Sequence, residues 1–336
     1  MKTNKWTEYK FSNGKVAKNR VVVPPMASQT ADEEGFVTAA TLKHYENLAE
    51  SQAGLIFVEY SFIHQSGRGE KNQLGVDSDS KISGLKNIAD GIHKNGALAG
   101  FQIVHAGGKT DSKITGQLLL GASAVSVPVK GWQPELPVEM DISNIKEYIQ
   151  WYVDAAIRVY QAGFDLVEIH AAHGYGLNQW LSPITNHRAD KYGGSIDNRG
   201  RVLTAIVQQI KIQFPELLIS VRIPAQDYIP GGLSLLEMLK IVETLENAGV
   251  DLINVSSGIG GWRRPDGRSG EGYLVDDAAK IKLATSLPVI GVGGIESGAA
   301  INQMLAEGKI DFAAVGRAIL KNPAGWYRDN LAMNCS

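Results

Sequence analysis

Cysteine is nearly absent from this chain of 336 residues, whose single thiol is Cys335, next to the C-terminus. One cysteine cannot form a disulfide within the chain, and it cannot build a Cys-rich zinc site or a Cys-ligated iron–sulfur cluster. A catalytic thiol in the body of the protein is excluded as well. The sequence contains no supported set of metal ligands, so we expect no metal site.

An excess of charge of one sign and long apolar runs are also missing. The chain has 33 basic and 35 acidic residues, a net charge of −2. This balance offers no basic surface for a phosphate backbone, so we expect no nucleic-acid partner. No run approaches the ~18 apolar residues of a membrane span, and no signal peptide follows Met1. We therefore expect a cytoplasmic protein without a membrane partner.

The sequence does contain two alternating patterns. Short apolar runs rich in valine and isoleucine alternate with segments whose apolar residues recur every three or four positions. The short runs predict strands covered on both faces, and the longer segments predict helices with one buried face. The predicted strands are 20–24, 55–60, 99–104, 166–170, 218–223, 252–256, 289–292 and 312–315. The predicted helices are 38–51, 82–94, 145–161, 199–214, 235–248, 276–285, 298–307 and 324–333.

This series of strand–helix pairs predicts an α/β fold, a (β/α)8 TIM barrel. The competing fold is a doubly wound sheet, but its Gly-x-Gly-x-x-Gly fingerprint is absent. We expect residues 1–336 to form a single domain. Its first 19 residues would cap the base of the barrel, with Asn13-Gly14 as a hairpin turn. The connection from 106 to 143 would be an ordered excursion over the catalytic face.

Chemically capable residues follow the predicted strands, where TIM barrels place their sites. The strand 166–170 runs into His170, His173 and Tyr175, two imidazoles and a phenol that can polarise a substrate oxygen and supply a proton. By contrast, we expect His105 and Glu59 to be structural.

Glycines follow the last two predicted strands, as Gly293-Gly294 and Gly316-Arg317. Backbone N–H groups at such turns and a neighbouring guanidinium suit a phosphate, so we expect a phosphorylated ligand. The loop residues Trp262, Arg263 and Arg264 are equally compatible with a ligand contact and with a solvent-facing loop.

Several longer motifs, in order along nearly the whole chain, resemble the Old Yellow Enzyme family of FMN-dependent NAD(P)H oxidoreductases. The similarity is greatest to its bacterial branch of xenobiotic- or thermophilic-like ene-reductases. The motifs lie at 19–26, 100–107, 168–175, 181–183, 186–188, 192–195, 198–199 and 315–317.

The resemblance implies FMN at the barrel mouth and NADPH or NADH as the reductant. It implies that His170 and His173 hold the substrate oxygen of an α,β-unsaturated carbonyl or nitro compound. Hydride would pass from the reduced flavin to the β-carbon, with Tyr175 as the proton donor. The implied cofactor contacts are Pro25, Met26, Ala27, Tyr60, Gln102, His170, Arg222, Gly293, Gly294, Gly316 and Arg317.

Two positions depart from the family pattern. Ala27 stands where relatives have threonine or cysteine, which predicts a changed flavin potential, and Tyr60 stands where a small residue is usual. Relatives are often dimers or tetramers, so we expect a homo-oligomer. The alternative to an ene-reductase is a flavin-binding store or sensor protein without significant turnover.

Overall fold

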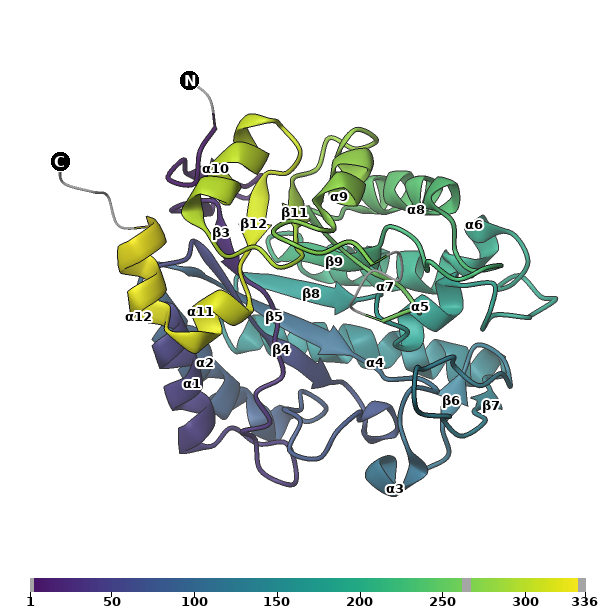
Figure 1. Cartoon of the computed structure of the whole chain (residues 1–336). Helices are drawn as coiled ribbons and strands as arrows, with labels where there is room; N and C mark the ends of the chain where they lie inside the picture. Colours follow the sequence, from purple (N-terminus) through teal and green to yellow (C-terminus); the bar gives the residue numbers. More distant parts are fainter. Residues whose placement is uncertain (1–2, 262–266, 332–336) are drawn as a thin grey trace.

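The barrel predicted from the sequence is present in the structure, a computed structural model that describes residues 3–261 and 267–331. Its strands pair in parallel and close in the order β10-β11-β12-β3-β4-β5-β8-β9 (Figure 1). Closure rules out the doubly wound sheet. The barrel strands are β3 (Val21–Val23), β4 (Leu55–Phe62), β5 (Leu98–Val104), β8 (Leu166–His170), β9 (Leu218–Pro224), β10 (Leu252–Ser256), β11 (Val289–Gly291) and β12 (Phe312–Ala314).

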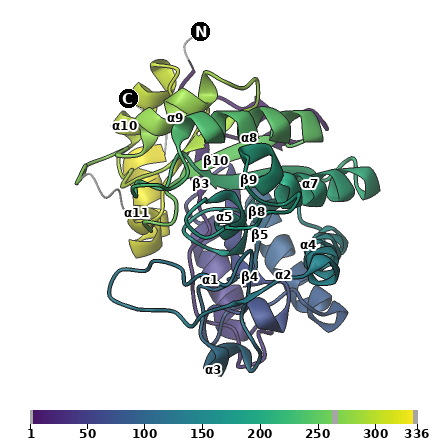
Figure 2. The same ribbon diagram turned by 90° about the vertical axis from the view of Figure 1, so that its right-hand side faces the viewer.

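Helices surround the barrel, and the view turned by 90° shows the same arrangement (Figure 2). The main ones are α1 (Ala39–Ala49), α2 (Ile82–His93), α4 (Ile142–Gln161), α7 (Arg201–Gln213), α8 (Leu235–Ala248), α9 (Val275–Lys282) and α10 (Gly298–Ala306). Shorter helices are α3 (Ser112–Thr115), α5 (Gly176–Leu181), α6 (Ile196–Arg199), α11 (Arg317–Lys321) and α12 (Pro323–Trp326). Short helical turns lie at Gln65–Gly67, Asp79–Lys81 and Tyr327–Leu331.

Three predicted helix boundaries were wrong. The helix predicted over 145–161 begins earlier, at Ile142, because Asp141 and Asn144 form a capping box there. The helix predicted over 199–214 is two helices that meet at Gly200, where a Cβ would lie 2.4 Å from Ile241 Cδ1 of α8. The segment predicted over 324–333 is α12 followed by a π-helical turn.

Alternate residues of three neighbouring strands point into the barrel and form layers along its axis. The lowest layer is apolar, the middle layer is polar and fully buried, and the top layer lines a cavity. From bottom to top these residues are Leu166, Glu168 and His170 of β8, Leu218, Ser220 and Arg222 of β9, and Leu252, Asn254 and Ser256 of β10.

A hairpin closes the base of the barrel, as expected. It consists of β1 (Tyr9–Lys10) and β2 (Val16–Ala17), joined through Gly14 at φ 87°. Its polar contacts reach residues just before three strands: Ser12 binds Asp251, Asn13 binds the Glu216 carbonyl, and Lys15 pairs with Asp165. The hairpin therefore lies at the end of the barrel opposite the His170 layer.

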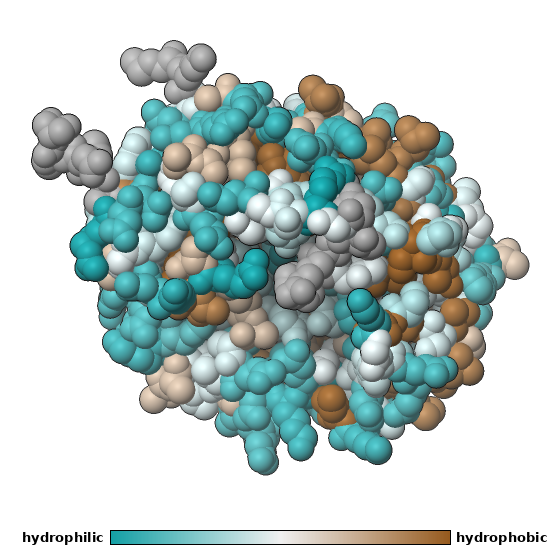
Figure 3. Space-filling view, in the orientation of Figure 1, coloured by the Kyte–Doolittle hydropathy of each residue, from teal (hydrophilic) through white to brown (hydrophobic). Residues whose placement is uncertain are grey.

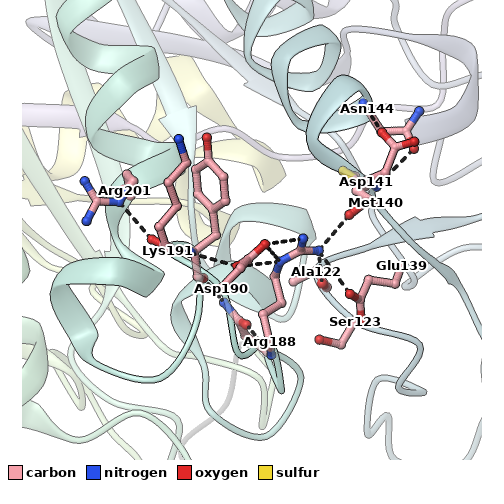
Figure 4. Close-up of polar contacts among 12 residues, drawn as sticks. Ala122, Ser123, Glu139, Met140, Asp141, Asn144, Arg188, Asp190, Lys191 and Arg201 are labelled. Atoms are coloured by element: carbon pink, nitrogen blue, oxygen red, sulfur yellow. Dashed lines mark hydrogen bonds and ion pairs between the residues drawn. The ribbon is translucent and has the colours of Figure 1, made fainter.

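The excursion from 106 to 143 is ordered and contains α3, β6 (Leu120–Gly121) and β7 (Val138–Glu139). Arg188 binds it to the rest of the fold by donating to the carbonyls of Ala122 at 3.0 Å and Met140 at 2.7 Å, while also pairing with Asp190 (Figure 4). None of the residues 106–143 lines the cavity itself, but Lys109, near the start of the excursion, contacts Tyr175 at the cavity wall.

Most of the face seen in Figure 3 is hydrophilic, and brown side chains gather toward its right-hand side. The exposed apolar residues of the excursion include Leu118, Leu136 and Val138. Among the described residues, every helix is too short or too polar to span a bilayer.

Candidate active site

A cavity of about 490 Å³ opens at the carboxyl ends of the barrel strands. All of the residues that the sequence assigned to the site line it, although they come from seven of the eight barrel strands or the loops that follow them. They are Pro25, Met26, Ala27, Tyr60, Gln102, His170, His173, Tyr175, Arg222, Gly293, Gly294, Gly316 and Arg317. The cavity also contacts residues that the sequence did not single out, among them Glu70, Ser256 and Tyr273.

His170, His173 and Tyr175 cluster at the end of β8. The His170 ring centroid lies 5.0 Å from that of His173 and 5.2 Å from that of Tyr175. His173 has a φ of 58°, in the left-handed region that costs a non-glycine residue on the order of 1 kcal/mol. The next loop residue, Gly174, is fixed by a 2.7 Å hydrogen bond from its N–H to Asn178 Oδ1. The fold thus holds an unfavourable conformation that brings the two imidazoles together.

Both imidazoles are neutral near pH 7. Burial lowers the pKa of His170 and of His173 well below the usual value, and the positive charge of Arg222 lowers it further. His170 Nδ1 accepts a hydrogen bond from the N–H of Ala172 at 3.3 Å, which leaves the proton on Nε2. His173 Nε2 lies 2.6 Å from Ser256 Oγ. His170 can therefore donate one hydrogen bond without carrying a charge.

Lys109 places a positive charge against Tyr175. Its ammonium lies 4.7 Å from the Tyr175 ring centroid and donates to the His173 carbonyl at 2.5 Å. Burial lowers the pKa of Lys109 to about 8, so it is charged at neutral pH. A cation here favours the phenolate that Tyr175 becomes when it gives up a proton. No sequence pattern indicates this contact, because Lys109 is distant from Tyr175 along the chain.

Tyr60 is brought to the cavity by an irregularity in β4. The pairing of β4 with β5 shifts between Val58 and Ser61, so one extra residue is inserted into β4. The Tyr60 ring stacks on that of Tyr175, with centroids 5.5 Å apart. Its hydroxyl donates to Glu70 Oε1 at 2.5 Å. Tyr60 therefore links Tyr175, whose phenol carries the proton, to the carboxylate of Glu70.

A buried polar layer orients Gln102 beneath the cavity. Glu168 accepts hydrogen bonds from Gln102 Nε2 at 2.7 Å, Ser220 Oγ at 2.8 Å and Asn254 Nδ2 at 2.9 Å. Burial raises the pKa of Glu168, whereas the Arg222 charge and these donors lower it. Because the amide nitrogen of Gln102 is used by Glu168, its oxygen is left to accept from a ligand.

The residues present fit FMN. Among the described residues, Arg222 Nε is a buried nitrogen with no hydrogen-bond partner, which calls for an acceptor supplied by a ligand. Gly293 and Gly294 have φ of 118° and 65°, and a Cβ at either would lie 2.9 Å from a backbone atom. These turns therefore require glycine, and both glycines line the same cavity as Arg317. The cavity therefore suits FMN at both ends. The Arg222 guanidinium and the oriented Gln102 amide match the polar edge of a flavin ring, and the glycine-lined end beside Arg317 matches a phosphate.

Two residues expected to be structural lie outside the cavity lining. Glu59 accepts from the Ser28 N–H at 3.0 Å and from Tyr45 at 3.1 Å. The pKa of His105 is lowered to about 3 by burial, and its Nε2 lies 3.0 Å from Ser66 Oγ. The motif at 186–188 is structural too, through the Arg188 contacts of Figure 4. Trp262, Arg263 and Arg264 lie outside the described residues.

A closed barrel with these groups at its mouth defines a class of flavin-dependent oxidoreductases. Residues 9–328 match the NADH:flavin oxidoreductase / NADH oxidase family, and the chain belongs to that family. The resemblance to the Old Yellow Enzyme family is thereby confirmed, and membership implies FMN as the cofactor.

Known proteins similar to this chain differ in length. The chain is 37% identical over 311 residues to a NADPH dehydrogenase of Bacillus pumilus (strain SAFR-032), covering 92% of this chain and 89% of that protein. It is 38% identical over 324 residues to an NADH oxidase of Thermoanaerobacter brockii, covering 93% of this chain and 49% of that protein. A 2-naphthoyl-CoA reductase superposes with a TM-score of 0.89 at 27% identity, covering 96% of this chain and 51% of the other. The chain thus spans about half the length of two of these relatives.

Proposed function

We propose that this protein is an FMN-dependent NAD(P)H oxidoreductase that reduces the C=C bond of an α,β-unsaturated carbonyl or nitro compound. The observation that carries the proposal is the meeting of two neutral imidazoles, the buried His170 and the half-buried His173, with a phenol at one cavity wall. The names of the two curated relatives, NADPH dehydrogenase and NADH oxidase, support a nicotinamide reductant.

Each residue has a separate task in this proposal. His170 and His173 donate hydrogen bonds to the carbonyl or nitro oxygen and withdraw electron density from the conjugated carbon. Tyr175 gives its proton to the α-carbon, and Lys109 stabilises the resulting phenolate. Burial raises the pKa of Tyr175, so the phenol holds its proton at neutral pH.

The remaining residues hold the cofactor. Gln102 and Arg222 would bind the polar edge of the ring, Pro25, Met26 and Ala27 would border it, and Gly293, Gly294, Gly316 and Arg317 would hold the phosphate. When bound, FMN supplies the two-electron chemistry between NAD(P)H and the substrate. Arg222 then provides a fixed positive charge in a buried setting, which favours an anionic ligand.

Three measurements test the proposal. The purified protein should be yellow, its chromophore should bleach anaerobically with NADPH or NADH, and cyclohexenone should restore the colour with formation of cyclohexanone. Tyr175→Phe should slow the cyclohexenone step on the order of a hundredfold while leaving bleaching intact. Tyr160→Phe, a surface substitution, is the control. If neither NADPH nor NADH bleached the chromophore, the store or sensor alternative would be favoured.

We also propose a homo-oligomeric assembly and a cytoplasmic location for the enzyme, on the expectations stated from the sequence. Sedimentation analysis and fractionation of the source cells measure these two properties directly.

A further inference from the structure

The polar contacts beside Tyr175 continue along the wall of the cavity through Tyr60 and Glu70. The Tyr175 ring stacks on that of Tyr60 with centroids 5.5 Å apart, and the Tyr60 hydroxyl opposes the effect of burial on the pKa of Tyr175. The Tyr60 hydroxyl in turn donates to Glu70 Oε1 at 2.5 Å. The second Glu70 oxygen accepts from Gln29 Nε2 at 2.7 Å, in an exposed contact. A continuous row of hydroxyl and carboxyl groups therefore joins Tyr175 to solvent.

The proposed reaction requires a way to return a proton to Tyr175, and this row of groups can provide it. Each turnover takes one proton from Tyr175, and that proton has to be replaced before the next turnover. A substrate or product in the cavity covers the side of the phenol that faces it, so a route along the cavity wall is needed. The row through Tyr60 and Glu70 is such a route, because a half-buried carboxylate exchanges protons with water readily.

We propose that Glu70 and Tyr60 form a proton relay that returns a proton from solvent to Tyr175 between turnovers. The relay rests on the proposed function. In the relay step, protonated Glu70 gives its proton to the Tyr60 oxygen while the Tyr60 hydroxyl proton passes to the Tyr175 phenolate oxygen. One O–H bond breaks at each donor and one forms at each acceptor, and nothing is oxidised or reduced. The Glu70 carboxylate then takes up a proton from water.

The local fold supports this role. The extra residue in β4 turns Glu59 and Tyr60 to different neighbours: Glu59 binds Tyr45 of α1, and Tyr60 binds Glu70. Glu70 itself is positioned by its backbone carbonyl, which accepts from Arg68 Nε at 3.0 Å. The Lys109 charge lies on the Tyr175 ring, where it favours the phenolate that the relay discharges. Glu70 and Tyr60 are thus positioning residues that act through Tyr175.

The relay can be separated from the chemical step by comparing the first turnover with later ones. Tyr60→Phe keeps the stacked ring but removes the hydroxyl, and Glu70→Gln keeps a hydrogen-bond acceptor but removes the titratable proton. In rapid-mixing experiments with NADPH and cyclohexenone, both variants should form one product per site in the first turnover, and Glu70→Gln should do so at the wild-type rate. Later turnovers of both variants should then be slower than their first by about tenfold or more. With ferricyanide, which takes electrons without a proton, Glu70→Gln should turn over like the wild type.

The matched control is Tyr45→Phe, which removes another buried hydrogen bond between a tyrosine and a glutamate outside the cavity. It should show no burst. Equal steady-state rates of Tyr60→Phe and the wild type would overturn the relay alone, and so would an equal slowing of the first and later turnovers. A wild-type protein that forms no cyclohexanone would overturn the proposed function, and the relay with it.

Discussion

The side-chain amine of Lys109 changes its charge state close to neutral pH. Burial lowers this pKa to about 8, so the group is charged below that pH and neutral above it. The neighbouring imidazoles do not titrate in the same range, because the pKa values of His170 and His173 are well below the usual value. A pH change near 8 therefore alters one charge beside Tyr175.

We predict that the rate of cyclohexenone reduction falls by about tenfold as the pH rises through about 8, because the phenolate loses its neighbouring cation. Lys109→Met should have a low rate at pH 7 and lack this step. Lys109→Arg, which stays charged, should keep the rate high above pH 8. A step that persists in Lys109→Met would assign the titration to another group.

Short local signals decide where several elements begin and turn. The helix α8 starts with a capping box in which Ser234 Oγ accepts from the Glu237 N–H and the Glu237 side chain accepts from the Ser234 N–H. Glu237 also pairs with Arg199 of α6 at 2.5 Å. Glu237 therefore both caps α8 and holds the neighbouring helix α6 through Arg199.

Ser234→Ala should lower the free energy of unfolding by about 1 kcal/mol, since it leaves an N-terminal N–H of α8 without its acceptor. Thr244→Ala, at a half-buried position later in α8, should change the free energy by no more than about 0.5 kcal/mol. Urea titration followed by circular dichroism measures both. If both substitutions lowered the free energy of unfolding equally, the Ser234 cap would contribute no more than an ordinary side chain in α8.

The two ends of the barrel differ in role: the basal hairpin packs one end, and the active-site cavity opens at the other. Phe11 of the basal hairpin is 3% exposed, and its ring stacks on that of Phe312 with centroids 6.0 Å apart. The hairpin fills the interior below the polar layer, whereas the cavity lies above that layer. A substitution that changes the packing of the basal hairpin should therefore leave the structure of the cavity unchanged.

Phe11→Ala should destabilise the protein by about 3–5 kcal/mol because it leaves a cavity in a packed interior. Well below the new melting temperature, FMN content and the rate of bleaching by NADPH should stay as in the wild type. Val16→Ala, at a position 41% exposed in the same hairpin, should have little effect on the melting temperature. Loss of FMN from folded Phe11→Ala protein would contradict the separation of the two ends.

Sequence patterns were sufficient for the fold and for the list of candidate residues. Largely apolar runs such as 166–170 indicate strands covered on both faces, and each is followed by a helix, which favours the closed barrel. The rule that barrel sites lie at strand ends then identifies His170 and Arg222. Helix boundaries were less predictable, as at Gly200, where close packing against Ile241 of α8 leaves no room for a Cβ and no local pattern reports that packing.

The sequence by itself determined the barrel, its basal cap and the residue types at its mouth, since these depend on local periodicity and on chain order. Only the tertiary structure decided the partners of those residues, because hydrogen bonds and charges act across space between distant segments. Glu168 orients Gln102 from 66 residues away, Lys109 faces Tyr175, and an inserted residue in β4 sends Tyr60 to Glu70. Those contacts set the charge and the proton path at the site.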